Sequence, residues 1–209
     1  VQKINYTPND NALEILGIWD TPEPRYFFST FTYKNHWCAF ALSSLIIGFC
    51  LFYRELKYLG HEVLIHDTKL NTKISEVCET EINYVCVPTP QAENGSCDTS
   101  IIESVINELG QCNYKGIIAI RSTVVPGFTQ SMIEKFNNLT ICFVPEFLRE
   151  RCAEDDFINN HKLLAVGTHD IWVFRKVVRS HGKLPEHTEH LTPNEAEVLK
   201  YFNNVYAAL

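Results

Sequence analysis

The stretch that most constrains the fold is Trp37–Tyr53, which carries no charged side chain. A membrane-spanning helix needs about 20 apolar residues, and this run lies at or below the short end of that range. A helix candidate at Phe52–Leu59 overlaps its end, and Gly60 and the β-rich run His61–Asp67 follow. Glycine just past a helix, then a strand that ends in an acidic residue, is typical of a β-α-β unit. We therefore favour a buried strand with its crossover helix, and a membrane anchor remains the alternative.

Strands and helices continue to alternate after this unit, which indicates an α/β fold: a Rossmann-like, doubly wound, mostly parallel sheet. Residues 1–36 show no sustained helical or strand period, so we expect an irregular N-terminal arm before a dinucleotide-binding domain at residues 37–193. The further expected elements are a strand at Ile82–Val87, a helix from about Asp98 to Leu109, a strand at Gly116–Ile120 buried on both faces, a helix around Gln130–Phe136 and a strand at Thr140–Val144.

The composition argues against several classes of function. The formal net charge is −7 and no cluster of lysine and arginine offsets it, which disfavours a nucleic-acid surface. Eight cysteines occur without a Cys-x-x-Cys pair or a nearby histidine at metal-ligand spacing, so no metal site is expected. Reduced thiols of a cytoplasmic protein are the simplest interpretation. No basic segment leads into an apolar stretch at the N-terminus, so no signal peptide is expected.

The first β-α-β unit predicts where a dinucleotide would bind. Asp67, at the end of the second strand, is the residue expected to bind the ribose hydroxyls. The glycine-rich turn that brings backbone amides to the pyrophosphate should fall near residues 43–49. This segment reads Ser-Ser-Leu-Ile-Ile-Gly-Phe, with Gly48 as its one glycine. Ser43 and Ser44 could donate hydroxyls to a phosphate, whereas the bulky apolar side chains Leu45, Ile46 and Phe49 would crowd its approach.

Five segments farther along the chain carry a more specific signal. In order and spacing they resemble the UDP-glucose/GDP-mannose dehydrogenase family, from about Gly60 to Leu209. The resemblance implies an NAD-binding domain, with residues 194–209 as the start of the linker and dimerisation helix. The segments are Cys86–Pro90 (CVPTP), Gly95–Asp98 (GSCD), Arg121–Gly127 (RSTVVPG), Phe143–Arg151 (FVPEFLRER) and Asn194–Asn204 (NEAEVLKYFNN).

Enzymes of this family oxidise the C6 alcohol of a nucleotide sugar such as UDP-glucose to a carboxylate, in two NAD-dependent steps and through a cysteine-linked intermediate. By resemblance, Thr123 organises a water near the reacting carbon, and Glu146 and Glu150 hold water, substrate and the nicotinamide side, one of them as base. Lys200 and Asn204 stabilise the oxyanion. A base and oxyanion donors are what this chemistry requires. The implied cofactor-binding residues are Ser43, Ser44, Gly48, Asp67, Thr89, Thr123 and Glu150.

Both residue pairs also have simpler interpretations. Glu146 and Glu150 are four residues apart, so on a helix they would share a face and could form a solvated acidic patch. Lys200 and Asn204 have the same spacing, in a helix whose start Thr192–Glu195 has the sequence of a capping box with proline at the first helical position.

Two departures from the family pattern bear on activity: the altered glycine loop, and a sequence that stops at Leu209, inside the expected linker helix. The family's nucleophile lies beyond that helix in a Gly-Gly-x-Cys-x-Pro-Lys-Asp segment, which these 209 residues do not contain. We therefore expect that this chain alone does not convert UDP-glucose to the acid. The hypotheses are an NAD-binding dehydrogenase domain that works in a homo-oligomer or with another chain, a non-catalytic structural or interaction protein, a membrane-anchored protein, and a truncated or frame-altered copy of an active enzyme.

Overall fold

The computed structural model describes residues 13–15, 19–21, 60–67, 72–92, 95–147, 156 and 159–208, with side chains as far as 203. The chain divides into two compact units, Val1–Ala41 and Leu42–Leu209. In the first unit, strand β1 (Leu13–Ile15) pairs antiparallel with β2 (Trp19–Thr21), with Leu13 opposite Thr21. The predicted limits of the dinucleotide-binding domain, 37–193, stay a prediction.

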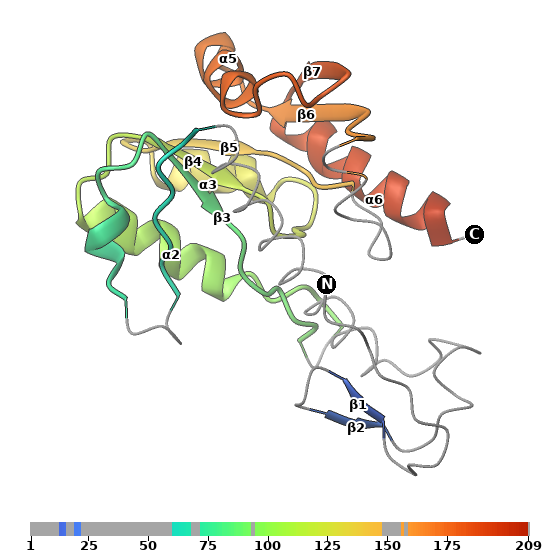
Figure 1. Cartoon of the computed structure of the whole chain (residues 1–209). Coiled ribbons are helices and arrows are strands. Elements are labelled where there is room, and N and C mark those ends of the chain that lie inside the picture. The colour runs from blue at the N-terminus through green and yellow to red at the C-terminus, as the bar shows by residue number, and fades with distance from the viewer. Residues whose placement is uncertain are drawn as a thin grey trace. The chain divides into compact units, whose positions relative to one another are not determined.

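The second unit is built on a sheet with the strand order β3-β4-β5-β6-β7 among its described residues (Figure 1). Strands β3, β4 and β5 run parallel, and so do β6 and β7. The two groups meet antiparallel at a single pair, Phe143 opposite Gly167. This confirms the predicted α/β class with a mostly parallel sheet. The strands are β3 (Ile82–Val85), β4 (Ile117–Ile120), β5 (Thr140–Phe143), β6 (Leu163–Gly167) and β7 (His187–Leu191).

Two of the described helices, α5 and α6, begin with side-chain caps. Asp170 accepts a hydrogen bond from the backbone N–H of Trp172 at the start of α5. At the start of α6, Glu195 accepts from the backbone N–H of Thr192, and the Thr192 hydroxyl accepts from the N–H of Glu195, which is the predicted capping box. The helices are η3 (Ile74–Val77), α2 (Ser100–Gln111), α3 (Phe128–Lys135), α5 (Ile171–Ser180) and α6 (Pro193–Ala208).

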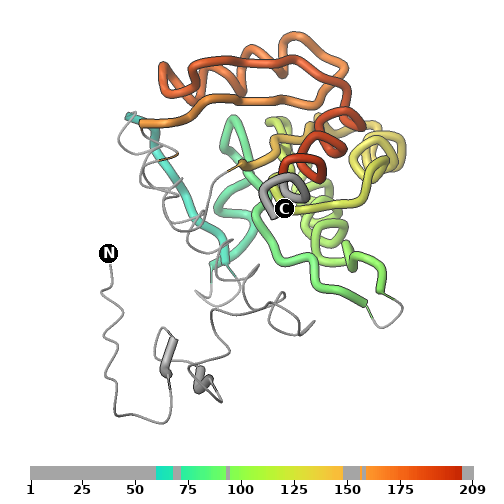
Figure 2. Tube along the Cα trace, turned by 90° about the vertical axis from the view of Figure 1, so that its right-hand side faces the viewer, coloured from blue at the N-terminus to red at the C-terminus, as the bar shows by residue number. Residues whose placement is uncertain are grey.

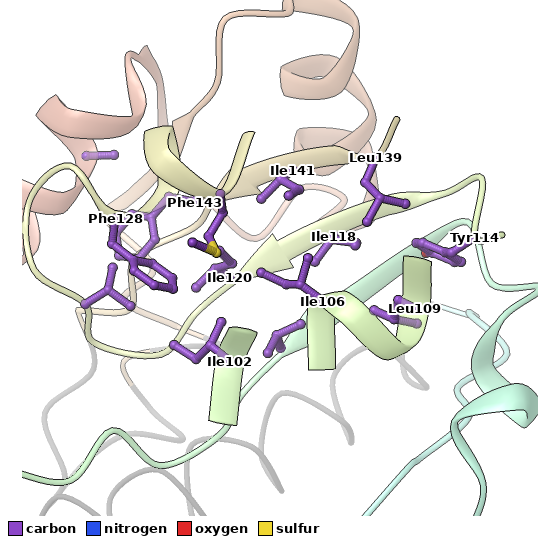
Figure 3. Packing of buried hydrophobic residues seen from close by; sticks show 14 residues of the cluster. Ile102, Ile106, Leu109, Tyr114, Ile118, Ile120, Phe128, Leu139, Ile141 and Phe143 are labelled. Atoms are coloured by element: carbon purple, nitrogen blue, oxygen red, sulfur yellow. The ribbon is translucent and has the colours of Figure 1, made fainter. Parts of the chain in front are cut away.

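Helices cover both faces of the sheet, as expected for a doubly wound fold. Alternate residues of β4 point to opposite faces of the sheet. Ile118 and Ile120 pack in one hydrophobic cluster, and Ile117 and Ala119 pack in the other. The first cluster includes the buried face of α2 and part of α3, seen in Figure 3, and the second includes α5. The prediction that residues 116–120 are buried on both faces is confirmed for β4.

Residues His61–Asp67 form no strand, so that part of the prediction was wrong. No ladder joins this segment to β3, the outer strand of the described sheet on that side. The segment is held instead by side chains: His61 Nε2 donates to the carbonyl oxygen of Ser180 at 2.9 Å, and the backbone N–H of Asp67 donates to the hydroxyl of Thr72 at 3.0 Å.

The apolar run Trp37–Tyr53 and the helix candidate at Phe52–Leu59 lie outside the described residues. Within the described part of the chain, no helix combines the length and the apolar character that a membrane span requires.

Helix α6 approaches the sheet closely at Gly167, the last residue of β6. Figure 2 shows α6, in red, beside the yellow chain of α3 and β5. A Cβ atom on Gly167 would lie 2.7 Å from the Cβ of Ala196 and 3.0 Å from the Cα of Pro193, both in α6. The absence of a side chain at Gly167 therefore permits the packing of α6 on β6.

We expect Gly167→Ala to lower the free energy of unfolding by about 1 to 3 kcal/mol, because α6 must shift away from β6. The matched control is Gly110→Ala in α2, where the new Cβ would make an ordinary 3.5 Å contact with Leu139. That change should be neutral or stabilising, because alanine favours helix over glycine. Urea unfolding measures both, and equal stability of the two variants would contradict the close approach.

Candidate functional site

The candidate site lies where the parallel strands β3, β4 and β5 end, which is where open α/β sheets bind ligands. The chain segments that follow these strands are tied together by Ser122. Its hydroxyl accepts a hydrogen bond from the backbone N–H of Val87 at 2.9 Å and donates to the carbonyl oxygen of Val87 at 2.7 Å. Ser122 is fully buried. The segments after β3 and β4 therefore have fixed positions relative to each other.

The segment after β3 folds back on itself and contacts the segment after β4. Gln91 and Cys97 form an isolated antiparallel bridge, and the Cys97 thiol donates to the carbonyl oxygen of Thr123 at 3.7 Å. Burial raises the pKa of the Cys97 thiol, and a hydrogen bond with Thr89 opposes that shift. Cys97 thus brings together Thr89 and Thr123, two residues that the sequence assigned to the cofactor site.

Lys200 enters the site from α6. Its ammonium donates to the carbonyl oxygen of Arg121 at 2.7 Å, and the residue is 6% exposed. Burial lowers the pKa of Lys200 to about 8, the Glu146 carboxylate opposes this shift, and the Arg121 charge adds to it. Lys200 and Glu146, both predicted catalytic residues, therefore interact electrostatically at the ends of β4 and β5.

Cys86, the first residue after β3, also interacts with these charges. Burial raises the pKa of its thiol to about 11, and Arg121 and Lys200 only partly oppose the shift. A thiol needs a low pKa to act as a nucleophile near neutral pH. Cys86 is therefore unsuited to nucleophilic attack near neutral pH, although it lies beside Lys200 and Glu146.

Glu197 holds α6 against the start of α3. This fully buried carboxylate accepts from the backbone N–H of Gly127 at 2.6 Å and from that of Thr129 at 2.8 Å. Gly127, with φ at +95°, precedes α3, so Glu197 supplies an acidic cap from a distant helix. The sequence analysis missed Glu197. The sequence pattern that could have revealed Glu197 is its position one turn before Lys200, on the face of α6 that also buries Ala196.

Asp67 is exposed at the end of its segment, where Thr72 hydrogen-bonds both its backbone N–H and its carbonyl oxygen. A hollow of about 320 Å³ lies between this segment and α2. Its described lining combines apolar and polar side chains: His66, Ser100, Ile101, Ser104, Val105 and Glu108. Such a lining has the mixed apolar and polar character of a small-molecule site.

The structure brings Thr89, Thr123, Glu146 and Lys200 to one end of the sheet. Asn204 lies in α6 one turn after Lys200, but its side chain is outside the described part. The remaining predicted site residues also lie outside the described residues: Ser43, Ser44, Gly48 and Glu150. The sequence predicted no individual role for Arg121, whose carbonyl oxygen accepts the hydrogen bond from Lys200; it was recognised only as the first residue of the segment Arg121–Gly127. No group of three or more potential metal ligands occurs among the described side chains.

Comparison with known proteins gives consistent results. Residues 54–178 match the profile described as "UDP-glucose/GDP-mannose dehydrogenase family, NAD binding domain". The chain is 34% identical over 142 residues to a UDP-glucose 6-dehydrogenase of Streptococcus pneumoniae, covering 61% of this chain and 35% of the relative. It is 28% identical over 160 residues to the UDP-glucose 6-dehydrogenase AglM of Haloferax volcanii, covering 67% and 37%.

Among solved structures, the chain resembles a ternary complex of GDP-mannose dehydrogenase from Pseudomonas aeruginosa, with 27% identity and a TM-score of 0.58 over 66% of this chain and 35% of that one. A UDP-glucose dehydrogenase from Pyrobaculum islandicum gives 27% identity and a TM-score of 0.57, covering 65% and 34%. The chain thus spans about a third of the length of these relatives.

We expect Glu197→Ala to lower the free energy of unfolding by about 3 kcal/mol, because two backbone N–H groups at the start of α3 lose a charged acceptor. The matched control is Glu195→Ala, which removes an exposed carboxylate two residues earlier in α6 and should cost clearly less. Urea unfolding of the three proteins measures this. Equal losses in both variants would mean that Glu197 does not join the two helices.

Lys200→Met gives a prediction on pH. The folded pKa of Lys200 is about 8 and its ordinary value is 10.5, so between these values the unfolded chain holds more protons at this residue. Stability rises with pH wherever the unfolded state binds more protons. The wild type should therefore gain stability relative to Lys200→Met as the pH rises from about 7 to about 10. Chemical unfolding at several pH values tests this, and a constant difference would show that the ammonium is not desolvated.

Proposed function

The chain belongs to the UDP-glucose/GDP-mannose dehydrogenase family, and we propose on this basis that it binds NAD⁺ and takes part in the oxidation of a nucleotide sugar. The observation that carries the proposal is the placement of Lys200. A buried lysine, hydrogen bonded to the segment after β4 and interacting with Glu146, lies where the parallel strands end. UDP-glucose is the substrate named for the Streptococcus and Haloferax relatives, and we propose a nucleotide sugar of this kind here.

The residues of this chain fit the roles that such a reaction needs. When bound, NAD⁺ accepts a hydride from the reacting carbon. Lys200 uses one N–H on the carbonyl oxygen of Arg121, so its ammonium retains further donors that can stabilise an oxyanion. Glu146 lies close enough to influence that ammonium, and its carboxylate can accept a proton or orient a water. Thr123, on the segment beside Cys97, completes the proposed set.

Cofactor binding would use the hollow between the Asp67 segment and α2. Ile101 and Val105 offer an apolar surface for an adenine ring, and the carboxylate of Asp67 offers an acceptor for ribose hydroxyls. The segment after β3, with Thr89, would line the path from this hollow toward Lys200. We propose a cytoplasmic location, in keeping with the reduced cysteines of the described part.

Complete oxidation to the acid requires a covalent cysteine step. The 209 residues contain no Gly-Gly pair and hence no Gly-Gly-x-Cys segment. We therefore propose that these residues bind the cofactor and orient the reacting carbon, and that by themselves they do not form the acid.

One observation favours a second candidate function, a non-catalytic structural or interaction protein. The segment Ser43–Phe49 replaces the usual glycines with leucine, isoleucine and phenylalanine, which could fill the pyrophosphate site. Cofactor binding distinguishes the two candidates, because only the first requires an open pyrophosphate site.

We predict that the purified, detergent-free chain binds NADH saturably, at about micromolar concentrations, in a fluorescence titration. Asp67→Ala should weaken binding about tenfold or more, since it removes a charged acceptor for ribose hydroxyls. The matched control is Glu189→Ala, which removes one carboxylate from exposed β7, at the edge of the sheet opposite β3. Its affinity should equal that of the wild type. Absence of binding to a folded sample at about millimolar NADH would support the non-catalytic candidate instead.

A further inference from the structure

Two cysteines outside the candidate site lie near each other. Cys78 is the residue at which η3 ends, and Cys112 is the residue at which α2 ends. The side chain of Cys112 interacts with the Cys78 thiol, which also donates to the carbonyl oxygen of Ile74 at 3.3 Å. Both are partly exposed free thiols. Two thiols that a small oxidant can approach therefore lie side by side at the ends of η3 and α2.

The surroundings hold this pair in place. Tyr114, two residues after Cys112, is buried, and its hydroxyl hydrogen-bonds the hydroxyl of Thr80, two residues after Cys78, at 3.4 Å. A Cβ on Gly116 would collide with that tyrosine oxygen, so the turn after α2 packs tightly. Cys78 itself packs against the cluster formed by α2 and β4. Folding therefore places the two cysteine side chains near each other.

We propose that Cys78 and Cys112 are a site of reversible oxidation, at which a small-molecule disulfide converts the two thiols into an intramolecular disulfide. One protein thiolate attacks the small disulfide, releasing one thiolate and forming a mixed disulfide. The second cysteine then attacks the protein sulfur and releases the other thiolate. Two protein thiols are oxidised, one small disulfide is reduced to two thiols, and the two protons pass to the released thiolates.

The two cysteines have unequal roles in this exchange. Partial burial and the neighbouring Cys112 raise the pKa of Cys78 to about 11, so Cys78 stays protonated at neutral pH. Because the thiolate is the attacking form, Cys78 is disfavoured as the first attacking group. Cytosolic disulfides are mostly transient and redox-sensing, which fits a reversible link between otherwise reduced thiols.

The link would act on the walls of the hollow described above. The segment that carries His66 and Asp67 leads into η3, and α2 forms the opposite wall. A bond between the ends of η3 and α2 would fix these walls relative to each other. It would also close a loop that contains β3 and the segment with Thr89.

The test uses the 209-residue chain with excess oxidised glutathione, alkylation of the remaining thiols, and digestion with trypsin and an enzyme that cleaves after glutamate. These enzymes place Cys78, Cys86, Cys97 and Cys112 on separate peptides, because Glu79, Glu81, Glu93 and Glu108 lie between them. We expect one linked product, Val77–Glu79 joined to Leu109–Lys115, detected by mass spectrometry and lost on reduction. In urea the link should lose its selectivity, because folding no longer holds the sulfurs together.

The control variant is Cys97→Ser, which removes another partly exposed thiol and should leave the linked peptide unchanged. Cys112→Ser should abolish the link. Oxidation should raise the unfolding temperature of the wild type and of Cys97→Ser, because a closed loop restricts the unfolded chain, and it should not raise that of Cys112→Ser. Full alkylation of both cysteines after oxidation, a stable mixed disulfide at Cys112, or equal linkage to Cys86 and Cys97 would each overturn the proposal.

Discussion

The contact between the Glu197 carboxylate and the start of α3 is the interaction on which the candidate site depends. Helix α6 follows the sheet in sequence, and without a long-range anchor it could rotate or slide on β6. Two contacts fix it: Glu197 on the backbone N–H groups of Gly127 and Thr129, and the close approach of Ala196 to Gly167. A buried carboxylate is stable there because the helix start supplies both hydrogen-bond donors and a favourable dipole. Lys200, one turn farther along, thereby reaches the carbonyl oxygen of Arg121.

This arrangement brings two buried cationic side chains, Lys200 and Arg121, close to the partly exposed Glu146. Lys200 and Arg121 carry positive charge, Glu146 carries negative charge, and the ionisable groups around them are held neutral. Burial raises the pKa of Cys86, and burial with the help of Arg121 lowers the pKa of His161 to about 4 and that of His181 to about 3. Neutral neighbours add no competing charge. Lys200, Arg121 and Glu146 therefore interact with one another beside groups that stay uncharged near neutral pH.

The sequence predicted local features well and long-range ones poorly. The strands β3, β4 and β5 and the capping box of α6 were predictable because each rests on a short, mostly apolar run or on neighbouring residues. The strand expected at His61–Asp67 was wrong: the segment pairs with no described strand, and β-propensity alone does not form a ladder. Strand β7, His187–Leu191, was not predicted, because its mostly exposed and polar residues show no apolar alternation. Glu197 was missed for a related reason: its partners lie 68 and 70 residues earlier in the chain.

The cost of burying Lys200 bears on the choice between the two candidate functions. The pKa of Lys200 falls from 10.5 to about 8 because its ammonium form is less stable in the folded chain than in water. At neutral pH the burial of this ammonium therefore opposes folding. Replacing a buried charged group by an apolar one of similar volume is often neutral or stabilising. In a protein that served only as a scaffold, the one contribution of this lysine that methionine could not supply would be the hydrogen bond to the carbonyl oxygen of Arg121. An ammonium held beside Glu146, with donors left over from its bond to Arg121, has a use in stabilising negative charge on a substrate. The free-energy cost of burying the Lys200 ammonium thus supports the dehydrogenase proposal over the structural one. This support is independent of the altered glycine loop.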